Sequence, residues 1–418
     1  MNNYDKHPRT LLVGFNEAYL KAVRERVPAD SIIALEEPDI IRKRDLAHKP
    51  QELSCLAEIV PAAYQQADGF VEVGRTLHER WPVEAVVPGL EYAVPAAAML
   101  AARLRLRGAT PNAAAILRDK ILLRQTTLRA GIPNPRFTEV HGPQDIIDFA
   151  SGGPVVVKPA GRQASVGVQL LDRCGPDEAE SAWRSVVEAG EYEQVPDRPM
   201  EWRYLAEERL RGPEYSVEVL VRDGEIVFEN VTEKAVIPGP HPVELGHVVP
   251  APLDARVRDM FARAIRALVD ATGFGTGILH AEWILTAEGP TLIECAGRCP
   301  GDRLIDLIDL AYDTQLRVAL IDLLAGRSPE LPAGPRRGSA IRFLTATPGR
   351  VLRVEGVDNA EKLPGVRELY VGASEGSEAK RWSSSWDRSG FVLVTAADGS
   401  EARERSTAAA ATVNILTA

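Results

Sequence analysis

The chain has 418 residues, of which 45% are hydrophobic and 26% charged, and its formal net charge is −10. This length predicts two or three domains, and the acidic balance argues against a broad electrostatic partnership with nucleic acid or anionic lipid. Because no apolar run reaches the roughly 18–20 residues of a membrane span, and no signal-peptide stretch opens the chain, we expect a cytoplasmic protein without membrane or nucleic-acid partners.

In the N-terminal part, short apolar runs alternate with helical patterns, which is typical of a parallel α/β layer. We expect strands at 11–15, 31–35 and 84–88, and helices at 17–26 and 95–107. A single glycine follows the first strand, where a dinucleotide-binding fold needs three. The pattern therefore disfavours NAD binding.

The rest of the chain is a mixed helix and strand region followed by a small strand-rich module. In chain order the patterns predict a helix at 111–131, a strand at 154–159, a Gly/Ser loop, a strand at 168–172, a strand–turn–strand unit at 204–221, a helix at 257–272, a hairpin at 280–285 and 291–295, a helix at 302–324 and a linker at 328–338. We expect an α/β and α+β protein with three domains, at 1–112, 113–326 and 327–418.

Several common catalytic and nucleotide-binding motifs are missing from the sequence, among them the P-loop, the G-x-S-x-G elbow and the H-E-x-x-H helix. Two lysines point to another phosphate site. Lys158 ends a fully apolar strand, where an unpaired charge is costly unless an anion meets it, and Lys120 lies early on a predicted helix. The loop around Ser165 can lay backbone N–H groups over phosphate oxygens. The alternatives are a lysine that reaches solvent and an ordinary turn.

Acidic residues complete the pattern. Glu282 and Glu294 fall on the two arms of the predicted hairpin, where two carboxylates repel unless a cation lies between them. Hard oxygen ligands of this kind suit Mg²⁺, and the alternative is a solvent-facing pair. Cys295 and Cys299 lie near His280, but their spacing disfavours a zinc site.

A third element is the segment 207–218, with a Gly-Pro turn between two strands. The backbone groups that this unit exposes can hydrogen-bond an adenine edge, and Glu214, just after the turn, can accept hydrogen bonds from ribose hydroxyls. The alternative is an ordinary surface hairpin.

The order of these elements along residues 10–320 resembles the ATP-grasp superfamily. The resemblance implies an ATP-grasp fold with a Rossmann-like N-terminal domain and a small C-terminal domain. It implies that Lys120, Lys158 and Ser165 contact ATP phosphates, and that Glu282 and Glu294 hold Mg²⁺, for which Mn²⁺ can substitute. By the same likeness the segment from Glu207 to Leu210 brackets adenine and Glu214 binds ribose.

Within the superfamily, three passages are similar to the L-amino-acid ligases that form dipeptides, the branch related to bacilysin synthetase. The first is 87–92, which contains Glu91. The second is 231–234 with 243–247, which contains Glu244 and His247. The third is 294–302, which contains Arg298 and Gly301. Ala296 departs from the asparagine of many ATP-grasp enzymes, which leaves open whether one or two magnesium ions bind.

This likeness implies a ligase that activates a carboxylate as an acyl phosphate and joins it to an amine, with amino acids as substrates and ADP and phosphate as products. Glu91 and Gly301 would bind substrate, Arg298 would stabilise the oxyanion, and His247 with Glu244 would bind the ammonium group or take its proton. A homodimer is compatible with the likeness. The alternatives are an ATP-grasp carboxylase or formyl-transfer enzyme, and a non-catalytic nucleotide-binding protein.

Overall fold

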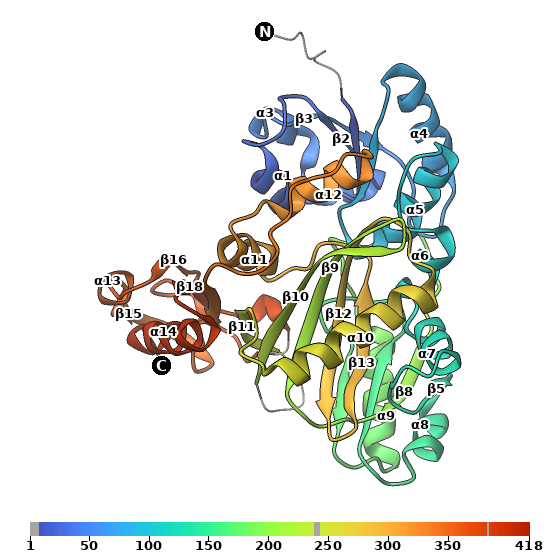
Figure 1. Ribbon diagram of the computed structural model, residues 1–418. Helices are drawn as coiled ribbons and strands as arrows, with labels where there is room; N and C mark the ends of the chain where they lie inside the picture. The colour runs from blue at the N-terminus through green and yellow to red at the C-terminus, as the bar shows by residue number, and fades with distance from the viewer. Residues whose placement is uncertain (1–7, 238–242, 383) are drawn as a thin grey trace.

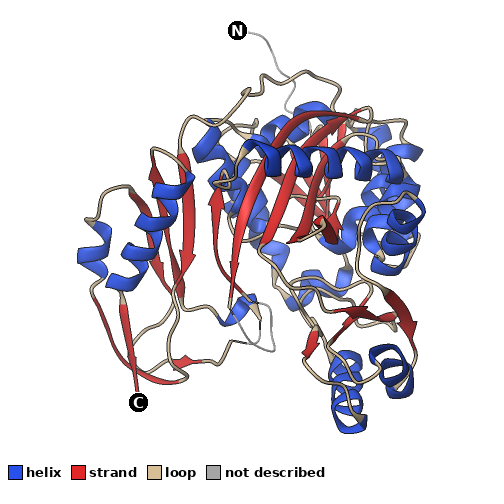
Figure 2. Cartoon of the chain, turned by 60° about the horizontal axis from the view of Figure 1, so that its bottom comes forward, coloured by secondary structure: helices blue, strands red, loops and turns tan. Residues whose placement is uncertain are grey.

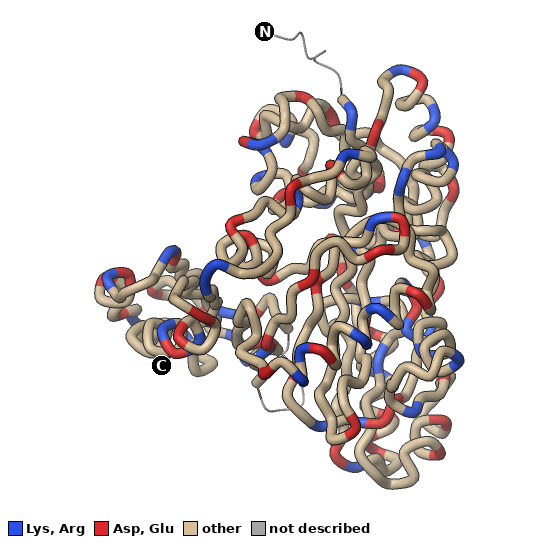
Figure 3. Tube along the Cα trace, in the orientation of Figure 1, with Lys and Arg blue, Asp and Glu red and all other residues tan. Residues whose placement is uncertain are grey.

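A computed structural model describes residues 8–237, 243–382 and 384–418. Residues 1–7 of the expected first domain, and residues 238–242 between the two halves of the expected pocket passage, lie outside this description. Within the described ranges, no helix combines the length and the apolar character that a membrane crossing requires. Figure 3 shows Lys and Arg interspersed with Asp and Glu through all parts of the chain in that view.

The N-terminal part is a parallel sheet covered by helices, as the alternating pattern predicts. Every residue of its two central strands is buried, which explains their uninterrupted apolar runs. The expected elements form within a few residues of their predicted bounds. The elements that the sequence did not predict are β3, α4 and the short helices α2, η1, α3 and η2. In the sheet order β3–β2–β1–β4, the strands are β1 Thr10–Val13, β2 Ile32–Glu36, β3 Leu56–Pro61 and β4 Ala85–Pro88, and the helices are α1 Glu17–Val23, α2 Pro38–Lys43, η1 Leu46–His48, α3 Lys49–Glu52, α4 Gly69–Arg80, η2 Glu91–Ala93 and α5 Val94–Arg103.

The prediction of one helix over 111–131 is wrong, because the chain forms two, α6 Pro111–Arg118 and α7 Lys120–Arg129. Asp119 separates them with extended backbone angles, and its carboxylate accepts hydrogen bonds from two N–H groups of α7 at 2.8 and 3.2 Å. This is the geometry of an N-cap. The break places Lys120 at the first position of α7.

A smaller lobe follows, built on a four-stranded antiparallel sheet with two helices packed on it (Figure 1, lower right). The predicted strands at 154–159 and 168–172 are confirmed as β6 and β7. In the sheet order β5–β8–β6–β7, the strands are β5 Phe137–Val140, β6 Val155–Pro159, β7 Gln169–Leu171 and β8 Tyr204–Glu208, and the helices are α8 Pro143–Ala150 and α9 Pro176–Glu188.

The centre of the molecule is an eight-stranded antiparallel sheet in the order β13–β12–β9–β10–β11–β14–β18–β16. The predicted hairpin forms as β12 and β13. The two strands predicted at 204–221 also form, but they do not pair: β8 lies in the smaller sheet and β9 in the larger one, so the link between them crosses from sheet to sheet. The bounds are β9 Glu214–Arg222, β10 Glu225–Val236, β11 Glu244–Val249, α10 Ala255–Thr272, β12 Gly277–Thr286, β13 Gly289–Ala296, β14 Gly338–Phe343, β16 Val366–Val371 and β18 Gly390–Ala396.

The single helix predicted over 302–324 is also wrong, since it is divided into α11 Leu304–Tyr312 and α12 Leu316–Leu324. Asp313 ends the first helix in the left-handed conformation, with φ 58°. The turn lets α12 pack against α1 and β4 of the N-terminal layer. Both helices join the apolar core beneath the parallel sheet.

The C-terminal module is joined to the rest by the central sheet, because β14 pairs with β11 on one side and β18 on the other. In Figure 2 the strands and the helices of this module lie at the left of the view, near the marked C-terminus. The alanine run 408–411 lies within the helix α14. The remaining elements are β15 Gly349–Glu355, α13 Val357–Glu361, β17 Glu378–Ala379, η3 Ser385–Asp387, α14 Gly399–Thr412 and β19 Asn414–Thr417.

Candidate functional site

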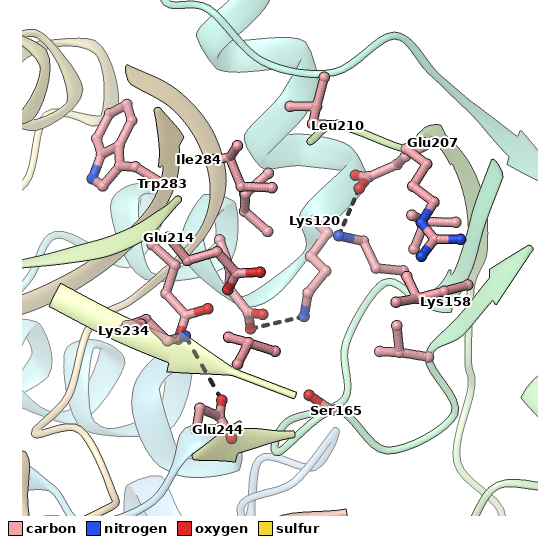
Figure 4. A pocket seen from close by; sticks show the side chains of 18 of the residues that line it. Lys120, Lys158, Ser165, Glu207, Leu210, Glu214, Lys234, Glu244, Trp283 and Ile284 are labelled. Atoms are coloured by element: carbon pink, nitrogen blue, oxygen red, sulfur yellow. Dashed lines mark ion pairs between the residues drawn. The ribbon is translucent and has the colours of Figure 1, made fainter. Parts of the chain in front are cut away.

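A cavity of about 490 Å³ lies between the smaller sheet and the central sheet (Figure 4). We call it the first cavity. Residues from both sheets, from the start of α7 and from the loop between β6 and β7 point into it. The candidate site residues that line it are Lys120, Lys158, Ser165, Glu207, Leu210, Glu214, Glu244, Glu282 and Glu294.

Lys158 and Glu207, on the neighbouring strands β6 and β8, form a buried ion pair. The Lys158 Nζ lies 2.6 Å from one oxygen of Glu207, and the Nε of Arg124 donates to the other oxygen at 2.8 Å. Burial lowers the pKa of Lys158, whereas for Glu207 the two cations outweigh burial and hold the pKa below its usual value. Two buried cations share one carboxylate, and an anion in the cavity would balance the excess positive charge.

Lys120 connects three elements at the same end of the cavity. Its N–H donates to the carbonyl of Ala160 at 3.0 Å, just after β6. Its Nζ lies 2.8 Å from Glu294 on β13 and donates to the carbonyl of Arg162 at 3.0 Å. The helix break at Asp119 is therefore what brings this ammonium group opposite the hairpin acid.

The loop between β6 and β7 is bent into the cavity by left-handed backbone. Ala164, Ser165 and Gly167 have φ values of 51°, 58° and 77°, which non-glycine residues adopt at a cost. At Gly167 a Cβ would approach Pro159 and Ala189 to 3.0 Å, so glycine is needed there. Ser165 reaches both this cavity and a second one described below.

The two hairpin acids face one another in register, as predicted. The Nζ of Lys234 lies 2.9 Å from Glu282, and the same carboxylate oxygen lies 3.1 Å from the Nε2 of His280. Burial raises the pKa of Glu282, but Lys234 and His280 hold it well below its usual value. Burial lowers the pKa of His280, and its two carboxylate partners raise it to about 9. Two flanking cations thus favour the ionised form of Glu282.

These acids fit a magnesium ion that is bound together with phosphate. Glu282 and Glu294 offer hard oxygen ligands on the cavity wall. In the described part of the chain, no group of three or more His, Cys, Asp or Glu is arranged to hold a metal. Mg²⁺ commonly takes one or two carboxylates and completes its shell with phosphate oxygens and water. Ala296, opposite His280 in register, adds no ligand.

The link between β8 and β9 forms another wall, with Leu210 and Glu214 facing the cavity (Figure 4). Gly212 in this link has φ 155°, and a Cβ there would lie 2.4 Å from the carbonyl oxygen of Leu285. Only glycine allows so close an approach to β12. Burial raises the pKa of Glu214, partly opposed by Lys234.

A second cavity of about 370 Å³ adjoins the first, and the two share Ser165, Lys234, Glu244, Glu282 and Glu294 in their walls. His247, Arg298 and Gly301 line only the second cavity. Its walls come from the N-terminal layer, the central sheet and the C-terminal module. The candidate residues are therefore gathered in two connected spaces.

Two ion-paired groups organise the second cavity. The Nε of Arg298 donates to the buried Glu91 at 2.8 Å, and Glu91 is not itself among the residues of the wall. His247 Nε2 lies 3.2 Å from Asp302, which also pairs with both terminal nitrogens of Arg388. Burial raises the pKa of Asp302, but Arg388 and His247 hold it well below its usual value. Among the described residues, the buried Nδ1 of His247 has no hydrogen-bond partner.

Some residues that line or support these cavities were not predicted as site residues. Lys234 lies on β10 and Arg124 on α7, and each carries a charge on an otherwise buried face, which is a readable signal. Ser385, Trp386 and Arg388 come from the C-terminal module and line the second cavity. No motif marks them, because their position depends on how β14 and β18 join the central sheet.

Residues 151–306 match the family described as ATP-grasp domain, and residues 342–418 match L-amino acid ligase C-terminal domain 2. The chain therefore contains an ATP-grasp domain. Over 340 residues it is 27% identical to alanine–anticapsin ligase from Bacillus amyloliquefaciens, which covers 75% of this chain and 66% of that one. It is 22% identical to the L-arginine-specific L-amino acid ligase from Bacillus subtilis, with 73% and 74% covered.

The fold is shared with solved structures of this type. The crystal structure of L-amino acid ligase from Bacillus licheniformis matches with a TM-score of 0.79 and 19% identity, over 99% of this chain and 100% of that chain. Other solved structures with this fold are complexes with ADP or its magnesium salt. The predicted ATP-grasp fold and the resemblance to L-amino-acid ligases are confirmed, and the named ligases among these relatives agree with the expected enzyme class.

The chain spans 64% to 68% of the length of the first curated relatives it matches. The activity and substrates of the whole protein are therefore proposals. The domain boundaries and the role of each site residue stay predictions.

Proposed function

We propose that this ATP-grasp protein is an ATP-dependent carboxylate–amine ligase that joins an amino-acid carboxylate to an amine and releases ADP and phosphate. One observation carries the proposal: a cavity with buried lysines and opposed acids shares a wall with a second cavity that contains an arginine. ATP in the first cavity would present its γ-phosphate to a carboxylate in the second.

In the first cavity, Lys120, Lys158 and Ser165 would contact the phosphates. The excess cationic charge around Glu207 supports this assignment, since a phosphate would neutralise it. The link at 207–214 would bracket adenine, and Glu214 would accept hydrogen bonds from ribose hydroxyls.

Glu282 and Glu294 would hold Mg²⁺, with Mn²⁺ as a substitute, and the ion would supply charge neutralisation on the phosphates. The protein's own contribution is to place cations beside these two opposed acids. Lys234 and His280 flank Glu282, and Lys120 pairs with Glu294.

The chemistry balances in two steps. A substrate carboxylate oxygen forms a bond to the γ-phosphorus while the bond from that phosphorus to the β–γ bridging oxygen breaks, so that ADP leaves. The amine nitrogen then bonds to the acyl carbon, the carbon–oxygen bond to phosphate breaks, and the nitrogen loses a proton.

Arg298 would face the oxyanion of the second step or the departing phosphate. Glu91 holds its Nε and so fixes the guanidinium plane. His247 and Glu244 would bind the ammonium group or receive its proton, and the unpartnered Nδ1 of His247 supports a polar ligand at that point. Gly301 leaves open space in the wall, since a Cβ there would meet no neighbour.

A phosphate-release screen over pairs of amino acids with ATP and Mg²⁺, followed by mass spectrometry of the products, tests the proposal. We expect phosphate only when a productive pair is present, together with a product whose mass is the sum of the pair minus water. Phosphate released with a carboxylated or formylated product would instead support the carboxylase or formyl-transfer alternative. We also propose a cytoplasmic location and, on the likeness to L-amino-acid ligases, a homodimer. Sedimentation analysis tests the homodimer.

A further inference from the structure

The C-terminal module reaches the second cavity through one short segment, residues 384–388. This segment is braced within itself. Ser384 caps the 3-10 turn η3 by accepting a hydrogen bond from the Trp386 N–H at 3.3 Å, and its own N–H donates to Asp387 at 2.9 Å. The Nε of Arg388 donates to the carbonyl of Ser385 at 2.7 Å. These hydrogen bonds fix the shape of the turn from within.

Two anchors fix the segment against the cavity. At one end, the hydroxyl of Ser385 donates to Glu244 at 2.9 Å. At the other, the guanidinium of Arg388 grips both oxygens of Asp302 and lies 3.7 Å from the centre of the Phe343 ring. Bidentate pairs of this kind fix orientation as well as distance. Both anchors end on residues that line the cavity.

Trp386 lies between the two anchors and lines the cavity, yet 77% of its surface is exposed. A large ring held in place but left uncovered is available to pack against a ligand. Leu90, Pro300 and Leu304 contribute further apolar surface to the same cavity.

The charged groups of this cavity are largely committed to one another. Arg298 pairs with Glu91, Arg388 with Asp302 and Lys234 with Glu282. A charged substrate side chain would have to break such a pair, whereas an apolar side chain can use the ring and its apolar neighbours. The arrangement selects for an uncharged, apolar substrate side chain.

We infer that segment 384–388 is a wall of the amino-acid site and that Trp386 packs against an apolar substrate side chain, which makes it a residue that determines specificity. The inference rests on the proposed function for the identity of the ligand. It gives the C-terminal module a direct part in substrate binding.

Calorimetric titration of the full chain tests this inference, with Mg²⁺ and a saturating non-hydrolysable ATP analogue present. The probes are L-phenylalanine, L-leucine and glycine. Trp386→Ala is expected to weaken the binding of the first two about 10-fold, the scale of a lost aromatic contact, and to leave glycine unchanged. Trp386→Phe should restore most of the affinity. Tyr370→Ala is the matched control, since Tyr370 is an exposed aromatic residue of the same module that lies outside both cavities.

Equal binding of L-phenylalanine and L-leucine by the parent and Trp386→Ala would overturn the inference, and so would a parent that binds neither. Equal weakening of all three probes would also overturn it, because that result indicates a general disturbance of the site. Turnover is measured separately. A parent that binds these amino acids but releases no phosphate with any pair would contradict the proposed function and leave the wall intact.

Discussion

Each charged side chain assigned to the phosphate site is already paired inside the protein. Lys158 pairs with Glu207, and Lys120 with Glu294. Buried charges need such partners, because an isolated one loses several kcal/mol of hydration, on the order of 5 kcal/mol or more. When phosphate enters, the ammonium groups would gain a second anion, and Mg²⁺ would take over the acids. The pairs thus keep the empty site stable while its groups remain ionised.

The first prediction concerns Lys158. Replacing it by alanine removes a charge-assisted contact to phosphate, but Arg124 still neutralises Glu207, so the fold should survive. We expect the affinity for a non-hydrolysable ATP analogue to fall about 10-fold or more, and amino-acid affinity to change little. Calorimetric titration measures both. Lys21→Ala, at an exposed lysine on α1, is the control, and equal nucleotide affinity in the two variants would remove Lys158 from the phosphate site.

The second prediction concerns Glu294. Glutamine preserves its size and a carbonyl oxygen but removes the negative charge that faces Glu282 across the hairpin. We expect phosphate release to fall at least about 100-fold, because metal binding and charge neutralisation are lost together. The thermal unfolding midpoint should stay close to that of the parent. Glu288→Gln, at the exposed turn of the same hairpin, is the control. A Glu294→Gln enzyme that turns over at the parent rate would show the metal assignment to be wrong.

The third prediction concerns Arg298. Lysine keeps the charge but loses the planar fork that donates to Glu91 and to the carbonyl of Cys299. We expect amide formation to fall about 100-fold, while ATP-analogue binding is kept. In the parent, ¹⁸O in the substrate carboxylate should appear in the released phosphate by mass spectrometry. Phosphate without label would exclude an acyl phosphate, whereas a full-rate Arg298→Lys enzyme would remove only this arginine from the oxyanion role.

At the residue scale, the site residues that can be predicted from the sequence are those whose charge is unusual for the apolar or like-charged segment around them. Lys158 on an apolar strand and the opposed hairpin acids are visible in the chain itself. Arg124 and Lys234 give the same signal and could have been found. Trp386 could not, because an exposed tryptophan beside a turn has no local peculiarity and gains meaning only from distant strands that carry it to the cavity.

At the scale of elements, both failed predictions have one cause. The apolar periodicity runs through 111–131 and through 302–324, but each is divided by a single aspartate, Asp119 or Asp313. Capping by Asp119 is local chemistry and could be recognised. The helix breaks at Asp119 instead of continuing because the Lys120 N–H donates a hydrogen bond to Ala160, just after β6. This contact joins segments that are distant in sequence. Strand predictions fared better, because burial on both faces leaves an uninterrupted apolar run.

The turn between α11 and α12 yields a prediction on pH and stability. Asp309 accepts a hydrogen bond from the Leu316 N–H at 2.8 Å, and burial raises its pKa to about 7. The pKa of Asp309 is therefore higher in the folded than in the unfolded chain. The protonated Asp309 stabilises the fold fully below about pH 4, and this contribution is lost as pH rises through 7. Asp309→Asn retains the acceptor oxygen and cannot ionise. We expect it to be more stable than the parent by on the order of 3 kcal/mol at pH 8, with little difference near pH 4.5.

Urea unfolding of the parent and Asp309→Asn at both pH values measures this difference. Asp322→Asn, at an exposed ion pair of α12, controls for general effects of removing an acid from this region. A stability difference that is the same at pH 4.5 and pH 8 would show that ionisation of Asp309 is not its source.

At the scale of the whole molecule, the segment 189–203 joins the smaller lobe to the N-terminal layer. Arg198 in this segment grips both oxygens of the fully buried Glu37 at 2.7 and 2.9 Å. Nearby, Glu191 accepts hydrogen bonds from the hydroxyl of Tyr92 and from the side-chain amide of Gln163 in the loop between β6 and β7. Tyr92 directly follows Glu91, the partner of Arg298. The tie therefore links the lobe that would cover ATP to the layer that supports the second cavity.

The last prediction follows from this tie. Arg198→Ala removes the bidentate grip but leaves Glu37 with hydrogen bonds from the N–H groups of Tyr64 and Gln65 at 2.9 and 2.7 Å, so the N-terminal layer should stay folded. The smaller lobe would then open more often, and a site that needs both sheets would be complete for a smaller fraction of the time. We expect faster hydrogen exchange in β5–β8 than in the parent, unchanged exchange in β9–β13, and an ATP-analogue affinity lower by about 3- to 10-fold. Hydrogen-exchange mass spectrometry and calorimetry provide these measurements. Arg184→Ala, which breaks an exposed pair with Glu180 on α9 of the same lobe, should change neither. If the two variants exchange alike, the pair between Arg198 and Glu37 does not hold the lobe closed.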